Sequence, residues 1–522
     1  MTDWSDSTGN VLAGSVPPSA RPGRLLLTEG LARQVLSGKS FLGSAYWILC
    51  VVAVGAAYGL GGIAALTMTL AAAIGLWAVV DAAAALWMTS GFLVFVMIFF
   101  QETAPTGDTL PEEFYLWGVG LLIITLGLVT ALLFSRQASW KTLNNRLRNS
   151  STKTMALLLV VFLLASGYGL LAGNDYNAVA RQLFGCVLLV VYYLLAIAFL
   201  RTPEDVERWL QRVTSVVVLG AIWFAGKLLF ASLAGGSYYR EQSHVVGYAG
   251  GIAVVAWNEL LRASRATSWL RWAAQFVICA AAILLAGNRA AMGCLLVVAG
   301  FSIFMTRKKR LVFLLVLCLL PAGVSLIPYL AGHLLSNQGL PGQIANRFIV
   351  SLEEDQSYQG RMEQWRAVLR TVEERPLLGA GMGSDFAFFA PGQRHQWRVA
   401  FVDNGWGFLL LKTGLLGIVV FLILLGISLR RALARLDVAG SSRLQVNSLS
   451  LLALFLYGVI GLFSGPTFFH FSGSGFLGTV LGGIVVLAEL RQRETGSASA
   501  AHGIAGGRCI GEKLPARRSP AC

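Results

Sequence analysis

The stretch that decides the fold is MALLLVVFLLASGYGLL at residues 155–171, which contains no charged side chain. A helix needs roughly 20 predominantly apolar residues to cross a bilayer, and this run is close to that length. Comparable runs recur along nearly the whole chain of 522 residues, which is 56% hydrophobic and only 13% charged. Soluble domains are typically about 45–50% apolar and about 25% charged. The sequence therefore predicts an all-α polytopic membrane protein.

The apolar runs predict about 12–14 transmembrane helices and one large, partly helical extracytoplasmic loop. The candidate spans are residues 41–60, 63–80, 82–100, 114–134, 155–171, 183–200, 213–233, 245–261, 272–287, 290–305, 311–330, 405–429, 448–463 and 476–490. The two short runs on either side of Asn288 and Arg289 are the least certain as complete crossings, and the first three spans are crowded.

Lys and Arg are distributed unevenly between the two sides of these spans. If the amino terminus lies inside, 29 of the 41 basic residues fall on the inner side, and seven of the ten outer ones lie in a single loop. Basic residues near span ends accumulate on the cytoplasmic side of a membrane. We therefore expect both termini in the cytoplasm. The net charge of +15 then indicates orientation and contact with anionic lipid, and predicts no nucleic-acid partner.

The long connection at residues 331–402 divides the chain. We expect a cytosolic tail (1–40), a first block of transmembrane helices (41–330), the large outer loop (331–402), a second block (403–490) and a disordered cytosolic tail (491–522). Within the loop, the run RMEQWRAVLRTVEER predicts an amphipathic helix that ends before Pro376. Its apolar positions at helical spacing are Met362, Trp365, Val368 or Leu369, and Val372.

The predicted outer side carries arginines, against the usual charge distribution. They are Arg240, Arg289, Arg347, Arg361, Arg366, Arg370, Arg375, Arg394 and Arg398. A guanidinium binds phosphate through paired hydrogen bonds and keeps its charge, so these side chains could hold an anionic lipid headgroup. Alternatively, each arginine could snorkel to the interface or pair with a carboxylate of the loop. Arg289 favours a ligand most, because it joins two apolar runs with no acidic neighbour in sequence.

Two lysines lie inside predicted spans, Lys227 and Lys412. A charge at that depth needs a carboxylate, a polar cavity or a neutral state. Either lysine could therefore line a substrate path or make a contact between helices, and the sequence does not separate the two roles.

Proton transfer has two candidates near the point where the long loop returns to the membrane, in FVDNGWGFLLLKTGLLG. Asp403 could act as a general base at the outer interface, with Asn404 beside it in contact with substrate. A carboxylate at the start of a helix could instead be the N-cap. His395, eight residues earlier, is the second candidate because imidazole titrates near neutrality.

The sequence predicts no metal and no cofactor. The seven cysteines fall in apolar runs or in the tail, without a spacing typical of disulfides or metal ligands. The glycines of LLGAGMGSDF, residues 377–386, resemble a dinucleotide fingerprint, but no strand, turn and helix surround them. We therefore reject a nucleotide site there.

The second half of the chain resembles the O-antigen ligase and polysaccharide polymerase family of bacterial inner-membrane glycosyltransferases. The likeness covers roughly residues 236–425. It follows, in order, the motifs YYREQSHVVGYAGGIA, LLAGNRAAMGCLLV, the pair NRF and GRMEQW, RPLLGAGMGS, and VDNGWGFLLLKTGLLG. The first half matches the family only through its spans.

The resemblance implies an enzyme of the inner membrane whose active site faces the periplasm. It would transfer a glycan from an undecaprenyl-pyrophosphate-linked donor to a hydroxyl of an acceptor glycan, with Arg240, Arg289 and Arg361 on the pyrophosphate. Ligases of the family commonly have His before Asn where this chain has Asp403 before Asn404, so we favour a polymerase over a ligase. Partners implied are the lipid-linked glycan, the acceptor, membrane lipids, and a chain-length regulator or flippase.

A transporter or lipid flippase is the main alternative from another functional class, since buried lysines could line a path. Such proteins often contain paired repeats with broken helices near the membrane midplane. The sequence shows no convincing internal repeat, and the arginine-rich loop suits a substrate held outside the membrane.

Overall fold

The computed structural model describes the chain over most of its apolar runs. The described residues are 65–100, 112–134, 140–233, 244–263, 265–286, 288–306, 356–389, 396–399, 402–433, 442–463 and 471–507. Contacts group the chain into two units, Met1–Thr69 and Leu70–Cys522, and the second unit holds all of the labelled helices and strands.

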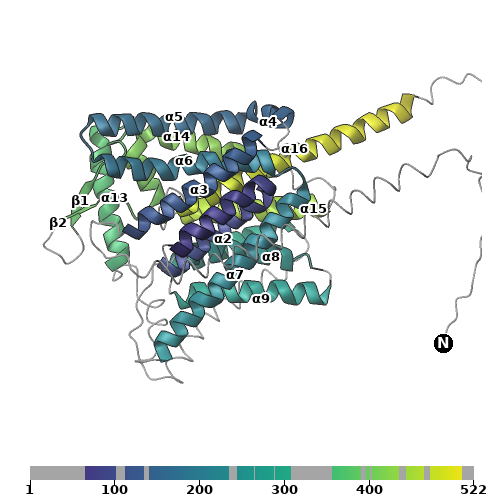
Figure 1. Ribbon diagram of the computed structural model, residues 1–522, viewed down its shortest axis with the longest axis horizontal. Helices are drawn as coiled ribbons and strands as arrows, with labels where there is room; N and C mark the ends of the chain where they lie inside the picture. The colour runs from purple at the N-terminus through teal and green to yellow at the C-terminus, as the bar shows by residue number, and fades with distance from the viewer. Residues whose placement is uncertain are drawn as a thin grey trace, which may run out of the picture. The chain divides into compact units, whose positions relative to one another are not determined.

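Helices form almost all of the described structure (Figure 1). A helix at Ala65–Val80 precedes the labelled ones. The labelled helices of the first block are α2 (Ala82–Phe100), α3 (Glu112–Phe134), α4 (Trp140–Leu147), α5 (Ser150–Leu171), α6 (Tyr176–Phe199), α7 (Pro203–Leu233), α8 (His244–Leu260), α9 (Ala266–Leu285) and α10 (Arg289–Thr306). They are followed by α13 (Gln356–Glu374), the antiparallel strands β1 (Phe386–Phe389) and β2 (Gln396–Val399), and then α14 (Gly405–Leu433), α15 (Ser442–Gly461) and α16 (Phe471–Gly507).

The protein is an all-α polytopic membrane protein, as the sequence predicts. In the described part of the chain, seven helices are long and apolar enough to cross a membrane, and three shorter apolar helices accompany them. Every predicted span falls on a described helix except residues 41–60 and 311–330, which lie outside the described residues. Of the uncertain runs beside Asn288, α9 is one of the seven long helices, whereas α10 is one of the three shorter ones.

One boundary differs from expectation at the carboxyl end. We expected disorder from residue 491, whereas α16 continues to Gly507. An ion pair of 2.5 Å between Glu489 and Arg493, one helical turn apart, supports the helix at this point. Alanines at 498, 500, 501 and 505 favour its continuation, because alanine has the highest helix propensity.

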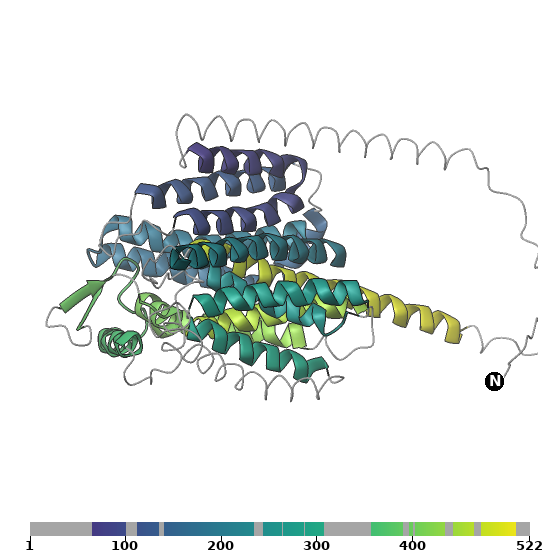
Figure 2. The same cartoon turned by 90° about the horizontal axis from the view of Figure 1, so that it is seen from below.

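The helices run alternately in opposite directions, so the bundle has two distinct ends (Figures 1 and 2). We call one the α4 end: it contains α4, the turn between α6 and α7, and the last residues of α14. We call the other the α13 end: it contains α13, the β1–β2 pair, the turn between α5 and α6, and the start of α14. Figure 2 shows α13 nearly along its axis, so it lies across the ends of the bundle helices.

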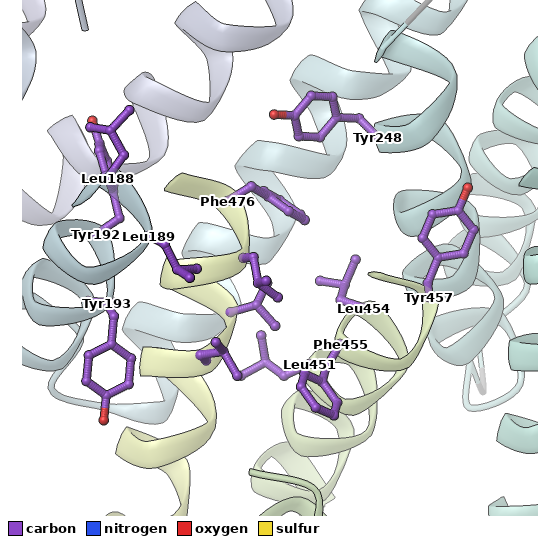
Figure 3. Close-up of a cluster of buried hydrophobic side chains, with 14 of the residues drawn as sticks. Leu188, Leu189, Tyr192, Tyr193, Tyr248, Leu451, Leu454, Phe455, Tyr457 and Phe476 are labelled. Atoms are coloured by element: carbon purple, nitrogen blue, oxygen red, sulfur yellow. The ribbon is translucent and has the colours of Figure 1, made fainter. Parts of the chain in front are cut away.

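Close packing of α6 against α16 forms the centre of the bundle. Small residues on α16 allow the approach, since a Cβ at Gly482 would lie only 2.6 Å from the Cβ of Ala196. Figure 3 shows the buried cluster that α6, α8, α15 and α16 share. In it, the rings of Tyr248 and Phe476 meet edge to face at 5.3 Å. These buried side chains pack α6, α8, α15 and α16 against one another between the two ends of the bundle.

Candidate functional site

Helix α13 is amphipathic as predicted, but its buried face is made by a partly different set of residues. Val368 and Val372 are buried, as the sequence predicts, whereas Met362 and Leu369 are exposed. The buried face is completed by Gln364 and Ala367, which stand at helical spacing with the two valines. A polar residue therefore occupies the face that packs on the bundle.

Gln364 joins α13 to Asp403, which lies two residues before the start of α14. The backbone N–H of Asp403 donates to Gln364 Oε1 at 3.0 Å, and Gln364 Nε2 donates to Asp403 Oδ2 at 3.3 Å. The Asp403 side chain itself is exposed. Gln364 was not among the residues singled out from the sequence. Its place on the apolar stripe of α13, four residues before Val368, was the one signal that could have identified it.

The helix cap at this point is Asn404 and not Asp403. The N–H groups of Trp406 and Gly407 donate to Asn404 Oδ1 at 2.9 and 3.0 Å, and Phe408 N–H donates to the Asn404 carbonyl at 2.8 Å. Asn404 Nδ2 also donates to the Phe463 carbonyl at 3.1 Å, which ties the cap to the end of α15. The N-cap role that could have explained Asp403 is thus taken by Asn404. The side chain of Asn404 is the one that accepts from the free N–H groups of the first helical turn.

The glycine-rich segment at residues 376–385 packs into the α13 end of the bundle. Gly379, Gly381 and Gly383 have φ of 65°, 82° and 78°, values that favour glycine. A Cβ at Gly381 would lie 2.8 Å from the Cα of Gly169 on α5. The glycines therefore permit close backbone approach between this segment and α5.

Helix α14 is interrupted at Gly414, where φ is 63°, and the glycine-rich segment fills the interruption. Ala380 N–H donates to the Leu411 carbonyl at 2.7 Å, and Leu415 N–H donates to the Pro376 carbonyl at 2.8 Å. Within a membrane, backbone N–H and C=O groups that lack a partner in their own helix need a hydrogen bond from elsewhere in the protein. The segment and α14 are therefore bonded through their main chains.

The buried Lys412 of α14 belongs to the same contact. Its ammonium group donates to the carbonyl and, at 3.2 Å, to the hydroxyl of Ser384. Ser384 is itself buried and donates to the Gly381 carbonyl at 2.8 Å. Of the two roles left open for Lys412, the structure shows the contact between elements. Lys227 lies half-buried on α7.

Beyond this contact the β1–β2 pair, which we did not predict, extends outward. Its register pairs Phe386 with Val399 and Phe389 with Gln396. Arg398 on β2 and Asp385 form an exposed ion pair at 2.5 Å, and this hydrogen-bonded carboxylate raises the pKa of the Arg398 guanidinium.

Several outer arginines pair locally, as the alternative interpretation allows. Arg366 pairs with Glu363, and the Arg375 guanidinium lies 5.8 Å from the centre of the Tyr168 ring. These two arginines therefore have local explanations.

Arg289 and Arg361 occupy the α13 end in half-buried positions. Arg289 is the first residue of α10, whose cap is Asn288: Ala291 N–H donates to Asn288 Oδ1 at 3.0 Å. Arg361 lies on α13, one turn before Gln364. Asp403, Asn404, Arg289 and Arg361 are thus at the same end of the bundle. Arg240, Arg347 and His395 lie outside the described residues.

Among the described residues, no group of three or more His, Cys, Asp or Glu side chains could hold a metal ion. Cys186, Cys279 and Cys294 are buried, free thiols. Our expectation that the site works without a metal or cofactor stays a prediction.

Residues 274–422 match the family model Wzy_C, described as O-Antigen ligase. The match begins in α9 and ends in α14, so it includes α10, α13 and the positions Arg289, Arg361, Asp403 and Asn404. It confirms the resemblance for the motifs within residues 274–422, while YYREQSHVVGYAGGIA and Arg240 lie outside the match. It supports glycan transfer of the O-antigen ligase or polymerase type. A search of proteins with curated function found no match.

Proposed function

We propose that this protein is a glycan polymerase of a surface polysaccharide or exopolysaccharide pathway. It transfers an oligosaccharide from an undecaprenyl-pyrophosphate-linked donor to a sugar hydroxyl of an acceptor glycan at the α13 end of the bundle. The observation that carries the proposal is the family match over residues 274–422, because the matched segment contains the helices that bring Asp403 and the two half-buried arginines to one end.

The chemistry divides between fixed positive charge and one base. Arg289 and Arg361, with Arg240 and Arg347, bind the pyrophosphate and stabilise the charge that grows on it as it leaves. Preorganised donors of this kind contribute on the order of 3–4 kcal/mol each to transition-state stabilisation. Asp403 accepts the proton of the acceptor hydroxyl, with His395 as the other candidate base. Pyrophosphate is a good leaving group, so we propose that no metal takes part.

A ligase is the second candidate, since the matching family is described as O-Antigen ligase. It would pass the finished glycan to lipid A core or another acceptor. We favour the polymerase because Asp403 stands where ligases of the family commonly have histidine. A flippase for the lipid-linked glycan remains the alternative from another class.

Orientation is part of the proposal: the α13 end faces the periplasm of a bacterial inner membrane. The positive-inside distribution supports this placement, because the short connections at the α4 end carry most basic residues between the spans. We expect a periplasmic reporter fused at Gln356 to be active and one fused at Arg493 to be inactive. The reverse pattern would reject the orientation and the proposed site with it.

A deletion strain complemented with variants tests the activity. In the deletion strain we expect single lipid-linked repeats to accumulate on the periplasmic face, and wild-type protein to restore long chains. Arg289→Ala and Arg240→Ala should abolish chain extension at nearly normal protein level. Arg289→Lys should rescue poorly, since a point charge cannot make the paired contact of a guanidinium.

Arg366→Ala is the matched control, because Arg366 is exposed and already paired with Glu363. It should keep full activity. Long lipid-linked chains that fail to reach their acceptor would instead identify a ligase, and repeats trapped on the cytoplasmic face would identify a flippase. Full activity of the Arg289→Ala and Arg240→Ala variants would show that these arginines only anchor the interface.

A further inference from the structure

Two hydrogen bonds join the side-chain amide of Gln364 to Asp403, one to its backbone and one to its carboxylate. One end of the Gln364 amide accepts from the Asp403 backbone N–H, and the other end donates to Asp403 Oδ2. A single hydrogen bond would leave the carboxylate free to rotate about its side-chain torsions. Two bonds to one planar amide fix both the main chain and the side chain of Asp403 relative to α13.

Gln364 can hold this geometry because it is itself held. Its side chain is 8% exposed and lies on the buried face of α13, next to Val368. Buried side chains in packed surroundings occupy few rotamers. The amide therefore has little freedom, and both of its polar ends are used on Asp403.

The residues on either side of Asp403 are also fixed. Val402 is 1% exposed, and Asn404 caps α14 and bonds to the end of α15. Asp403 alone in this short stretch presents its side chain outward. An exposed carboxylate on a backbone fixed from both sides and from α13 is what a positioned base requires, since catalytic groups must be held to a fraction of an ångström.

We infer that Gln364 is a positioning residue for Asp403, an inference that rests on the proposed function. Gln364 binds Oδ2 and directs Oδ1 of the carboxylate toward the acceptor. In the transfer, Oδ1 takes the hydroxyl proton, the acceptor oxygen forms a bond to the anomeric carbon, and the bond from that carbon to the pyrophosphate oxygen breaks. The lipid pyrophosphate leaves with the electron pair. Gln364 neither gains nor loses a proton.

A purely structural role is the competing explanation, because the same bonds attach α13 to the start of α14. The two roles differ in the pH dependence of transfer. A structural tie affects protein amount and melting temperature, whereas a group that touches the base changes the pH at which the base becomes active.

The test uses purified full-length protein in vesicles with a lipid-linked repeat as the donor, assayed across pH. Gln364→Glu places a second carboxylate within hydrogen-bond distance of Asp403. Neighbouring carboxylates share a proton, so the acidic limb of the kcat profile should move up by about one pH unit or more. The matched control is Gln396→Glu, which adds the same charge on exposed strand β2 and should leave the limb in place.

Gln364→Asn shortens the side chain and removes both contacts without adding charge. We expect kcat to fall about tenfold, the effect of one lost hydrogen bond to a charged group, with KM unchanged. An unmoved limb in Gln364→Glu, together with a Gln364→Asn variant that is only less stable, would overturn the positioning role and leave the proposed function standing. Absence of transfer by the wild-type protein would remove the proposed function and the positioning role together.

Discussion

The two ends of the bundle use the same kind of ion pair in opposite environments. At the α4 end, Arg146 binds Glu489 at 2.5 Å and also donates to the carbonyls of Ile197 and Leu200. At the α13 end, Arg398 binds Asp385 at the same 2.5 Å. The side chains of the first pair are 2% and 19% exposed, and those of the second are 76% and 42% exposed.

Burial decides what such a pair contributes. Removing one partner of a buried pair leaves an uncompensated charge and typically costs about 3–5 kcal/mol, whereas exposed pairs contribute about 0–1 kcal/mol. Arg431 adds to the α4 end by donating to the Ser151 hydroxyl at 2.6 Å. Arg146 and Arg431 at the α4 end therefore join elements of the bundle, whereas Arg398 at the α13 end makes its ion pair where solvent reaches it.

The largest expected effect on stability comes from breaking the α4 end. Arg146→Ala leaves the Glu489 carboxylate with only its exposed partner Arg493, and it removes the donor of two buried backbone carbonyls. We expect a loss of about 3–5 kcal/mol in the free energy of unfolding, which would strongly reduce the amount of folded protein. Thermal melting of purified protein measures it. A change below about 1 kcal/mol would mean that the pair behaves like one at the surface.

The next effect should be on activity at the α13 end. Asp403→Asn keeps the shape of the side chain but removes its basicity, so we expect transfer to fall by about 10²-fold or more at unchanged stability. Measurement of kcat and melting temperature on the same sample separates the two quantities.

Asn404→Ala is the matched control at the neighbouring position. It removes the cap of α14 and should cost about 1 kcal/mol of stability. If Asp403→Asn extends glycans at the normal rate while His395→Ala does not, the base is His395. Equal loss of stability in the two variants would return a capping role to Asp403.

The smallest effect should come from the exposed pair. Arg398→Ala is expected to change the melting temperature very little, and the small change should shrink further at high salt because exposed charges are screened. Melting temperatures at low and high ionic strength measure it. A loss as large as that of Arg146→Ala would erase the difference between the two ends.

The membrane helices could be predicted because their signal is local. An apolar run of about 20 residues has few stable arrangements other than a transmembrane helix, so composition alone predicted α2, α3, α5 through α10 and α14 through α16, but not the short polar helix α4. The helical part of the outer loop was predicted from spacing, and Val368 and Val372 confirm it. Met362 and Leu369 are exposed because two apolar stripes lie side by side on α13, and sequence spacing cannot say which one packs.

The site was less predictable because its contacts join distant residues. Gln364 lies 39 positions from Asp403, and a polar residue on an apolar stripe gives no indication of its partner. The choice of Asn404 over Asp403 as the cap depends on where the first helical turn closes, which differs by one residue between two good capping side chains. The β1–β2 pair escaped prediction because four-residue strands are too short for a clear alternating pattern.

The interruption of α14 at Gly414 has a consequence for how the protein assembles. A helix inserted into lipid by itself would expose the Leu411 carbonyl and the Leu415 amide, each at a cost of several kcal/mol. Their partners, Ala380 and Pro376, come from a segment that precedes α14 in the sequence and packs at the α13 end. The broken form of α14 can therefore be reached only after that segment docks. The order of biogenesis would then make formation of the α13 end the final step, so a partly assembled chain would hold its membrane helices without a working outer surface.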